Sequence, residues 1–106
     1  MSFSQLSGFK IAGISTCVPP DRVDNLEAGK DYGEVEVRKV VQMAGVRHRH
    51  VVAKGVTAVD LCTDAAKHLL KALNWAPDSI TGLIMVTQSP DYFLPSSSCV
   101  AHAQLG

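Results

Sequence analysis

The strongest potential nucleophiles in this sequence are its three cysteines, Cys17, Cys62 and Cys99. A catalytic cysteine needs a nearby base or a helix N-terminus that keeps it as a thiolate. Cys99 lies beside a predicted helix start, and His102 follows at i+3, so both side chains can share one helix face. This pair suits a small cysteine hydrolase or transferase, whereas in the structural alternative Cys99 is a small buried residue. Cys17 and Cys62 are interpreted as core residues.

A second polar group is the run Arg47-His48-Arg49-His50. On a strand, the two arginines share one face and the two histidines the other. Two arginines can grip a phosphate or carboxylate, and two histidines can bind a metal if a third ligand is near. No third ligand is evident, so anion contact is preferred to metal binding, with a solvated strand face as the structural alternative. Nucleotide-binding and hydrolase motifs are absent from the sequence, so we expect no metal or cofactor.

Composition restricts the class of protein. The formal net charge is zero, with 46% apolar and 19% charged residues, as in soluble globular proteins. Without a charge excess, the chain has little long-range attraction for nucleic acid or anionic lipid. No apolar run reaches the length of a bilayer span, and the first residues lack the basic region of a signal peptide. Because the cysteines are odd in number and widely spaced, we expect reduced thiols and a cytoplasmic protein with neither nucleic-acid nor membrane partners.

Two apolar runs, residues 9–17 and 82–87, are predicted to be buried strands. Asp21 and Asp24 follow two prolines and predict a turn. Residues 46–53 predict a short strand or hairpin arm. A strand, a long helix and a second buried strand would together form a βαβ unit.

Three helices are expected. Residues 34–44 carry apolar side chains at i, i+3, i+4 and i+7, and Gly45 suits the left-handed position after a helix end. Thr57 and Asp60 resemble a capping box that begins a helix ended by Asn74. Its apolar stripe consists of Cys62, Ala65, Ala66, Leu69, Leu70 and Leu73. Residues 96–105 open with good capping residues and predict a third helix.

Several segments, in order, resemble the opening of β-ketoacyl-ACP synthase III proteins. IAGISTCVPPDRVDN (11–25) is similar to the N-terminal strand and turn of that family, and VQMAGVRHRHVV (41–52) resembles its R-T-G-I-R-E-R segment. Residues 57–106 give the strongest match, because they resemble the helix, central strand, S-P-D-Y loop and P-S-x-x-C…L-G helix of the family.

The resemblance implies an α/β fold class, the N-terminal part of a thiolase-like fold with a mixed sheet and packed helices. Residues 1–106 would be an incomplete N-terminal half-domain of a homodimeric condensing enzyme. Such enzymes join an acyl group, from acyl-CoA or acyl-ACP, to malonyl-ACP through a cysteine thioester in fatty-acid or related biosynthesis. The family's catalytic cysteine follows the L-G matched by Leu105-Gly106, and its histidine and asparagine lie in the second half. The catalytic residues are therefore expected beyond Gly106, the chain alone is expected to be inactive, and Cys99 matches a non-catalytic position.

The resemblance also implies substrate-binding positions, namely Leu94, Met43 and Arg47. Leu94 falls where the family often has a phenylalanine that closes the partner's acyl pocket. Lys39 and Met43 match a tryptophan and an arginine that sandwich the CoA adenine, and neither reproduces that stack. The acyl donor therefore stays open between acyl-CoA, acyl-ACP and another thioester. The alternative function is a free-standing, non-catalytic dimerisation or binding domain.

Overall fold

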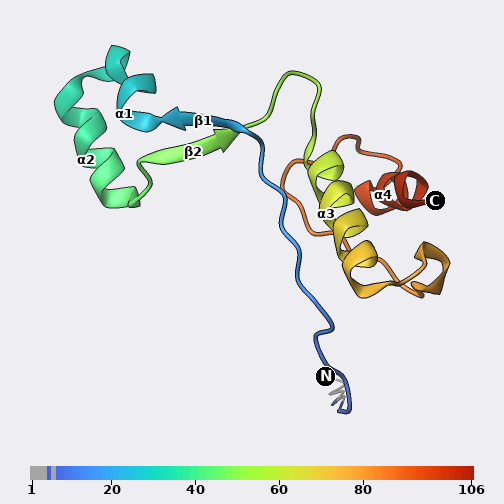
Figure 1. Cartoon of the computed structure of the whole chain (residues 1–106). Coiled ribbons are helices and arrows are strands. Elements are labelled where there is room, and N and C mark those ends of the chain that lie inside the picture. Colours follow the sequence, from blue (N-terminus) through green and yellow to red (C-terminus); the bar gives the residue numbers. More distant parts are fainter. Residues whose placement is uncertain (1–4, 6) are drawn as a thin grey trace.

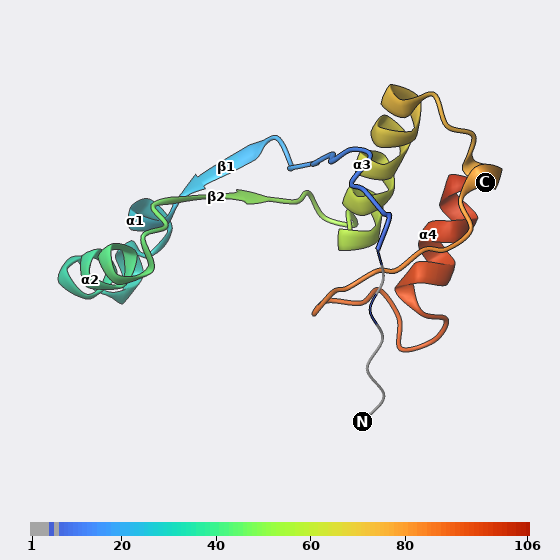
Figure 2. The same cartoon turned by 90° about the horizontal axis from the view of Figure 1, so that it is seen from below.

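The chain forms two groups of elements joined by a narrow β-ribbon (Figures 1 and 2). The computed structural model describes residue 5 and residues 7–106. The elements are β1 (Asp21–Asp24), α1 (Asn25–Ala28), η1 (Lys30–Tyr32), α2 (Glu34–Ala44), β2 (His48–Val51), α3 (Ala58–Leu73), η2 (Pro77–Ser79) and α4 (Ser97–Leu105). In both views α1 and α2 lie at one end of the ribbon, and α3 and α4 lie at the other.

The ribbon consists of β1 and β2, which pair antiparallel with Asp21 opposite Val51 and Asp24 opposite His48. The strand predicted within residues 46–53 is therefore confirmed. The turn predicted from Asp21 and Asp24 is wrong, because both residues belong to β1. Pairing with a strand distant in sequence overrides the local turn preference of aspartate.

Residues 9–17, predicted to be a strand, run as an extended segment without ladder hydrogen bonds in the part of the chain that the structure describes. The segment lies directly against α3. A Cβ on Gly13 would come within 2.8 Å of Leu69 Cδ1, so a larger residue here would require the Leu69 side chain to shift. Ile11 and Ile14 in this segment are 79% and 80% exposed.

Residues 82–87 were predicted to be a central strand, and they too have no strand pairing among the described residues. Leu83 and Met85 are partly covered, whereas Ile84 and Val86 are 91% and 93% exposed. This alternation is the period of a strand with one bare face. The predicted βαβ unit is therefore wrong for the described residues, which place a helix between two unpaired extended segments. A parallel strand forms only when a neighbour accepts its backbone bonds.

The three predicted helices are confirmed as α2, α3 and α4. Gly45 ends α2 with φ +68°, and its N–H donates to the Val41 carbonyl at 3.0 Å. Asn74 ends α3 in the same left-handed region, with φ +54°. Both helices therefore end at residues that adopt positive φ at low steric cost.

The buried core is small and lies between α3 and α4. Its fully or nearly buried residues are Val59, Ala101, Thr63 and Ser97. The accessible surface is 9086 Å², whereas a compact monomer of this mass would expose about 5,700 Å². The radius of gyration is 18.7 Å, against about 13 Å for a compact domain of this length. Within the described residues, no helix is long and apolar enough to cross a membrane.

Hydrogen bonds at the start of α3 fix the helix and bring α4 to it. The Thr57 N–H donates to Asp60 Oδ2 at 2.9 Å, and the Asp60 N–H donates to Thr57 Oγ1 at 3.2 Å, which is the predicted capping box. Gln104 Nε2 on α4 donates to Asp60 Oδ1 at 3.2 Å. These bonds stabilise the carboxylate, and the Thr57 backbone N–H is the main reason that the pKa of Asp60 lies below its ordinary value of 3.8.

Acidification is therefore expected to weaken this cap. Because the pKa of Asp60 is lowered by folding, its bonds stabilise the fold fully above the ordinary value of 3.8, and this contribution is lost as the pH falls through the lowered value. The urea midpoint, followed by far-ultraviolet circular dichroism, should fall as the pH goes from about 5 to about 2, and should fall less in Asp60→Asn. Asp64→Asn, which alters an exposed carboxylate on α3, should keep the wild-type dependence. Equal losses in Asp60→Asn and wild type would contradict this role.

Candidate functional site

The loop between Thr87 and α4 presents three large side chains to solvent. Tyr92, Phe93 and Leu94 are 59%, 101% and 86% exposed. The predicted pocket residue Leu94 thus lies at a loop tip, where it contacts little of its own chain. A side chain of this kind is available to line a pocket shared with other polypeptide segments.

This loop is attached to the start of α3. Thr57 Oγ1 donates to Asp91 Oδ2 at 3.0 Å, across 34 residues of sequence. Sequence reasoning assigned no role to Asp91 or Gln104. Thr57 and Asp60 were identified as a cap. Their bonds to Asp91 and Gln104 join residues far apart in the sequence, and no local pattern predicts such bonds. The only available signal was the S-P-D-Y resemblance, which contains Asp91 itself.

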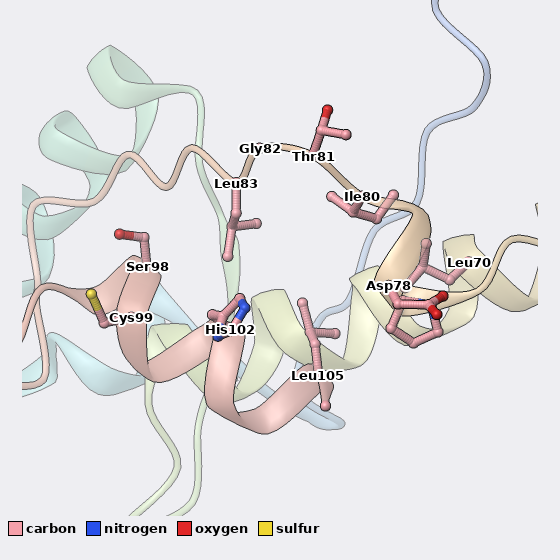
Figure 3. A pocket seen from close by; sticks show the side chains of 12 residues that line it. Leu70, Asp78, Ile80, Thr81, Gly82, Leu83, Ser98, Cys99, His102 and Leu105 are labelled. Atoms are coloured by element: carbon pink, nitrogen blue, oxygen red, sulfur yellow. The ribbon is translucent and has the colours of Figure 1, made fainter.

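A cavity of about 620 Å³ lies between α4 and residues 77–83 (Figure 3). His102 and Leu105 project from α4 toward Leu83, and Ser98 and Cys99 lie toward the beginning of the helix. The polar lining residues are Asp78, Thr81, Ser98, Cys99 and His102. Leucine, isoleucine and proline side chains supply most of the remaining wall, as in many small-molecule sites.

Cys99 and His102 both line this cavity, but no hydrogen bond joins them within residues 7–106. The Cys99 thiol instead accepts a bond from Ser96 Oγ at 3.3 Å. An activated cysteine needs a base within hydrogen-bond reach, and His102 does not provide that contact here. The geometry therefore gives the hydrolase or transferase interpretation of this pair no direct support.

Burial of the cysteines differs from the prediction. Cys17 is half-buried, whereas Cys62 and Cys99 are exposed. Cys62 borders a cavity of about 230 Å³ between α3, α4 and residues 83–86, where the extended segment does not close against the helices. The interpretation of Cys62 as a buried core residue is therefore wrong for this structure, as is full burial of Cys99.

The arginines near β2 bond to the residues that begin α1. Arg47 Nε donates to Asp24 Oδ2 at 3.2 Å, and Arg49 donates to Asn25 Oδ1. The pKa of Asp24 is lowered, first by the Leu26 N–H that its carboxylate caps and then by Arg47. Both guanidinium groups thus have partners within the chain, which favours a structural role over capture of a free anion.

The histidines of this run also bond within the chain. His48 Nε2 lies 3.4 Å from Asp24 Oδ2, and His50 Nδ1 lies 2.6 Å from the Pro19 carbonyl. Among the described residues, no cluster of three or more histidine, cysteine or acidic side chains has the arrangement of a metal site.

The predicted substrate-binding residues lie in two separate places. Met43 is 85% exposed on α2, one helical turn from the exposed Lys39, and Arg47 directly precedes β2. Leu94 belongs to the loop before α4. The ribbon separates these groups, since α2 and α4 lie at opposite ends of the molecule (Figures 1 and 2). These residues alone do not form one pocket.

Solved structures with this fold share substantial sequence with the chain, although no protein-family sequence model matches it. The 3-oxoacyl-(acyl-carrier-protein) synthase from Burkholderia xenovorans LB400 has 40% identity and a TM-score of 0.78, and the match covers 87% of this chain and 27% of that one. The 3-oxoacyl-(acyl-carrier-protein) synthase III from Aquifex aeolicus VF5 has 29% identity and a TM-score of 0.76, over 92% of this chain and 31% of that one. A tetronic acid condensing enzyme has 25% identity and a TM-score of 0.72, over 87% of this chain and 30% of that one.

The chain therefore spans about 30% of the length of the solved structures that it matches. The predicted α/β, thiolase-like fold class is confirmed by these structures and by the helices and antiparallel strands observed. The order of motifs in the sequence and the shared three-dimensional structure lead to one assignment: this chain belongs to the 3-oxoacyl-(acyl-carrier-protein) synthase III family.

Proposed function

We propose that this chain is the N-terminal part of an enzyme that condenses an acyl thioester with malonyl-ACP in fatty-acid or related biosynthesis. The observation that carries the proposal is the 40% identity to the Burkholderia xenovorans synthase over 87% of this chain. The catalytic cysteine, histidine and asparagine are proposed to lie outside residues 1–106, and the parent enzyme is proposed to be a cytoplasmic homodimer. Three free cysteines are consistent with a reducing compartment.

Within this proposal, the described residues bind and orient the substrate but form no covalent bond to it. Leu94 would border the acyl chain, and its exposed position on the loop supports a contact made outside its own chain. Met43 and Arg47 would approach the carrier of the acyl group. Because Met43 offers a polarizable thioether in place of a guanidinium, it contributes apolar contact but no charge-assisted bond to a phosphate. The donor is therefore proposed only as a thioester, either acyl-CoA, acyl-ACP or a related carrier.

A second candidate is the free-standing dimerisation or binding domain, because the chain exposes far more surface than a compact monomer of its mass. In that case the exposed apolar segments would associate with another polypeptide without catalysis. The first candidate requires the rest of a synthase for its activity. The second requires a chain that is stable by itself and binds another polypeptide without catalysis.

The first prediction concerns the chain by itself. Incubated with acyl-CoA or acyl-ACP and malonyl-ACP, it should release no thiol above the uncatalysed rate, and intact-mass spectrometry should find no acyl group on Cys99. The reason is that Cys99 has no bonded base. The Burkholderia xenovorans synthase is the positive control. Acylation of Cys99 that is lost in Cys99→Ser would contradict the proposal, and a stable dimer in sedimentation that is inert beside longer synthase chains would favour the second candidate.

The second prediction tests Leu94 in a chimera, in which this chain replaces the matching segment of the Burkholderia xenovorans synthase. The chimera should condense acyl thioesters, and Leu94→Phe should lower kcat/KM for the longest accepted acyl chain by about 10-fold or more, because the larger ring shortens the pocket. Val35→Phe, at an exposed position on α2, is the matched control and should leave the chain-length profile unchanged. A folded chimera without activity would contradict the proposed function, whereas an unchanged profile in Leu94→Phe would contradict only the role of Leu94.

A further inference from the structure

The loop that carries Leu94 has almost no packing to fix its position. Its tip, Tyr92 to Leu94, is exposed, and the backbone there forms no helix or strand. Within residues 7–106, the bond from Thr57 to Asp91 is the one hydrogen bond that ties residues 88–95 to another element. The position of the loop therefore depends on a single carboxylate.

The hydroxyl proton of Thr57 is free to serve Asp91. Thr57 Oγ1 accepts the Asp60 N–H at 3.2 Å, and Asp60 Oδ2 already receives the Thr57 backbone N–H at 2.9 Å. A hydroxyl can donate only one proton. Thr57 Oγ1 lies 3.2 Å from Asp60 Oδ2 and 3.0 Å from Asp91 Oδ2, so these two oxygens compete for that proton. Asp60 Oδ2 already accepts the Thr57 backbone N–H, so we assign the hydroxyl proton to the hydrogen bond with Asp91.

The anchor point is itself well fixed. Thr57 is the N-cap residue of α3, and Val59, two residues later, is fully buried. Gln104 ties α4 to the same cap through Asp60. A loop attached here takes its position from the contact between α3 and α4, which is the core of the chain. Asp91 is separated from Leu94 by two residues, so its attachment limits where Leu94 can project.

We propose that Asp91 is a positioning residue, which holds the loop against the start of α3 and thereby sets the direction of Leu94. The consequence for an acyl pocket rests on the proposed function, whereas the anchoring does not. The experiment below measures anchoring in this chain alone, so that its failure leaves the proposed function untouched.

The test is limited proteolysis by chymotrypsin, which cleaves after aromatic residues. Fragment masses separate cleavage after Tyr92 and Phe93 from cleavage after Phe9, which serves as an internal reference in the same molecule. Loss of one net hydrogen bond should raise the population of the open loop, and hence the cleavage rate after Tyr92 and Phe93, by about 3- to 10-fold in Asp91→Ala. Cleavage after Phe9 should not change.

Two further variants separate anchoring from a general loss of structure. Asp91→Asn keeps an acceptor oxygen for the Thr57 hydroxyl and should restore a rate near that of wild type. Asp78→Ala, which removes an exposed carboxylate from η2, should leave loop cleavage unchanged. The proposal is overturned if Asp91→Ala is cleaved at the wild-type rate, if Asp91→Asn is cleaved as fast as Asp91→Ala, or if Asp91→Ala loses helical circular dichroism and is cleaved faster after Phe9 as well.

Discussion

The contact between α3 and α4 is the interaction on which the rest of this structure depends. Val59 and Ala101 are its buried apolar residues, and few others in the chain lose so much contact with water. Full burial of one valine stabilises a fold by about 1.5–3 kcal/mol, which is small beside the entropy lost on ordering a chain of this length. Hydrogen bonds at the α3 cap therefore matter more than usual, because they join α3, α4 and the loop of Asp91 at one point.

Two extended apolar segments rest on this helix pair and leave large apolar side chains exposed to water. Ile11, Ile14, Ile84 and Val86 are all at least 79% exposed. The surface exceeds that of a compact monomer by about 3,400 Å², which is more than the 1,200–2,000 Å² buried in a standard protein interface. An excess of that size corresponds to a divided domain core. The synthases that match this chain are about three times longer, which is consistent with cover supplied by further polypeptide.

The sequence predicted local features well and long-range ones poorly. The bounds of α3 follow from Thr57, Asp60 and Asn74, which act on neighbouring backbone groups, and Gly45 ends α2 for the same kind of reason. By contrast, β1 was mistaken for a turn, since its pairing with β2 leaves no local trace. Residues 82–87 have the composition of a central strand, but strand formation needs a neighbour that local composition does not provide. The loop of Leu94 was located by its resemblance to the family. Its attachment through Asp91 is a contact across 34 residues, which only the three-dimensional structure shows.

Hydrogen exchange measured residue by residue would test the central claim, that the contact between α3 and α4 is the core on which the extended segments rest. Amides exchange slowly where they are bonded within a cooperative unit and fast where they face water. The account predicts the slowest exchange in Ala58–Leu73 and Ser97–Leu105, and exchange close to that of an unfolded peptide in residues 83–87. Protection of residues 83–87 equal to that of α3 would contradict the account, because it would mean that these backbone groups already have partners.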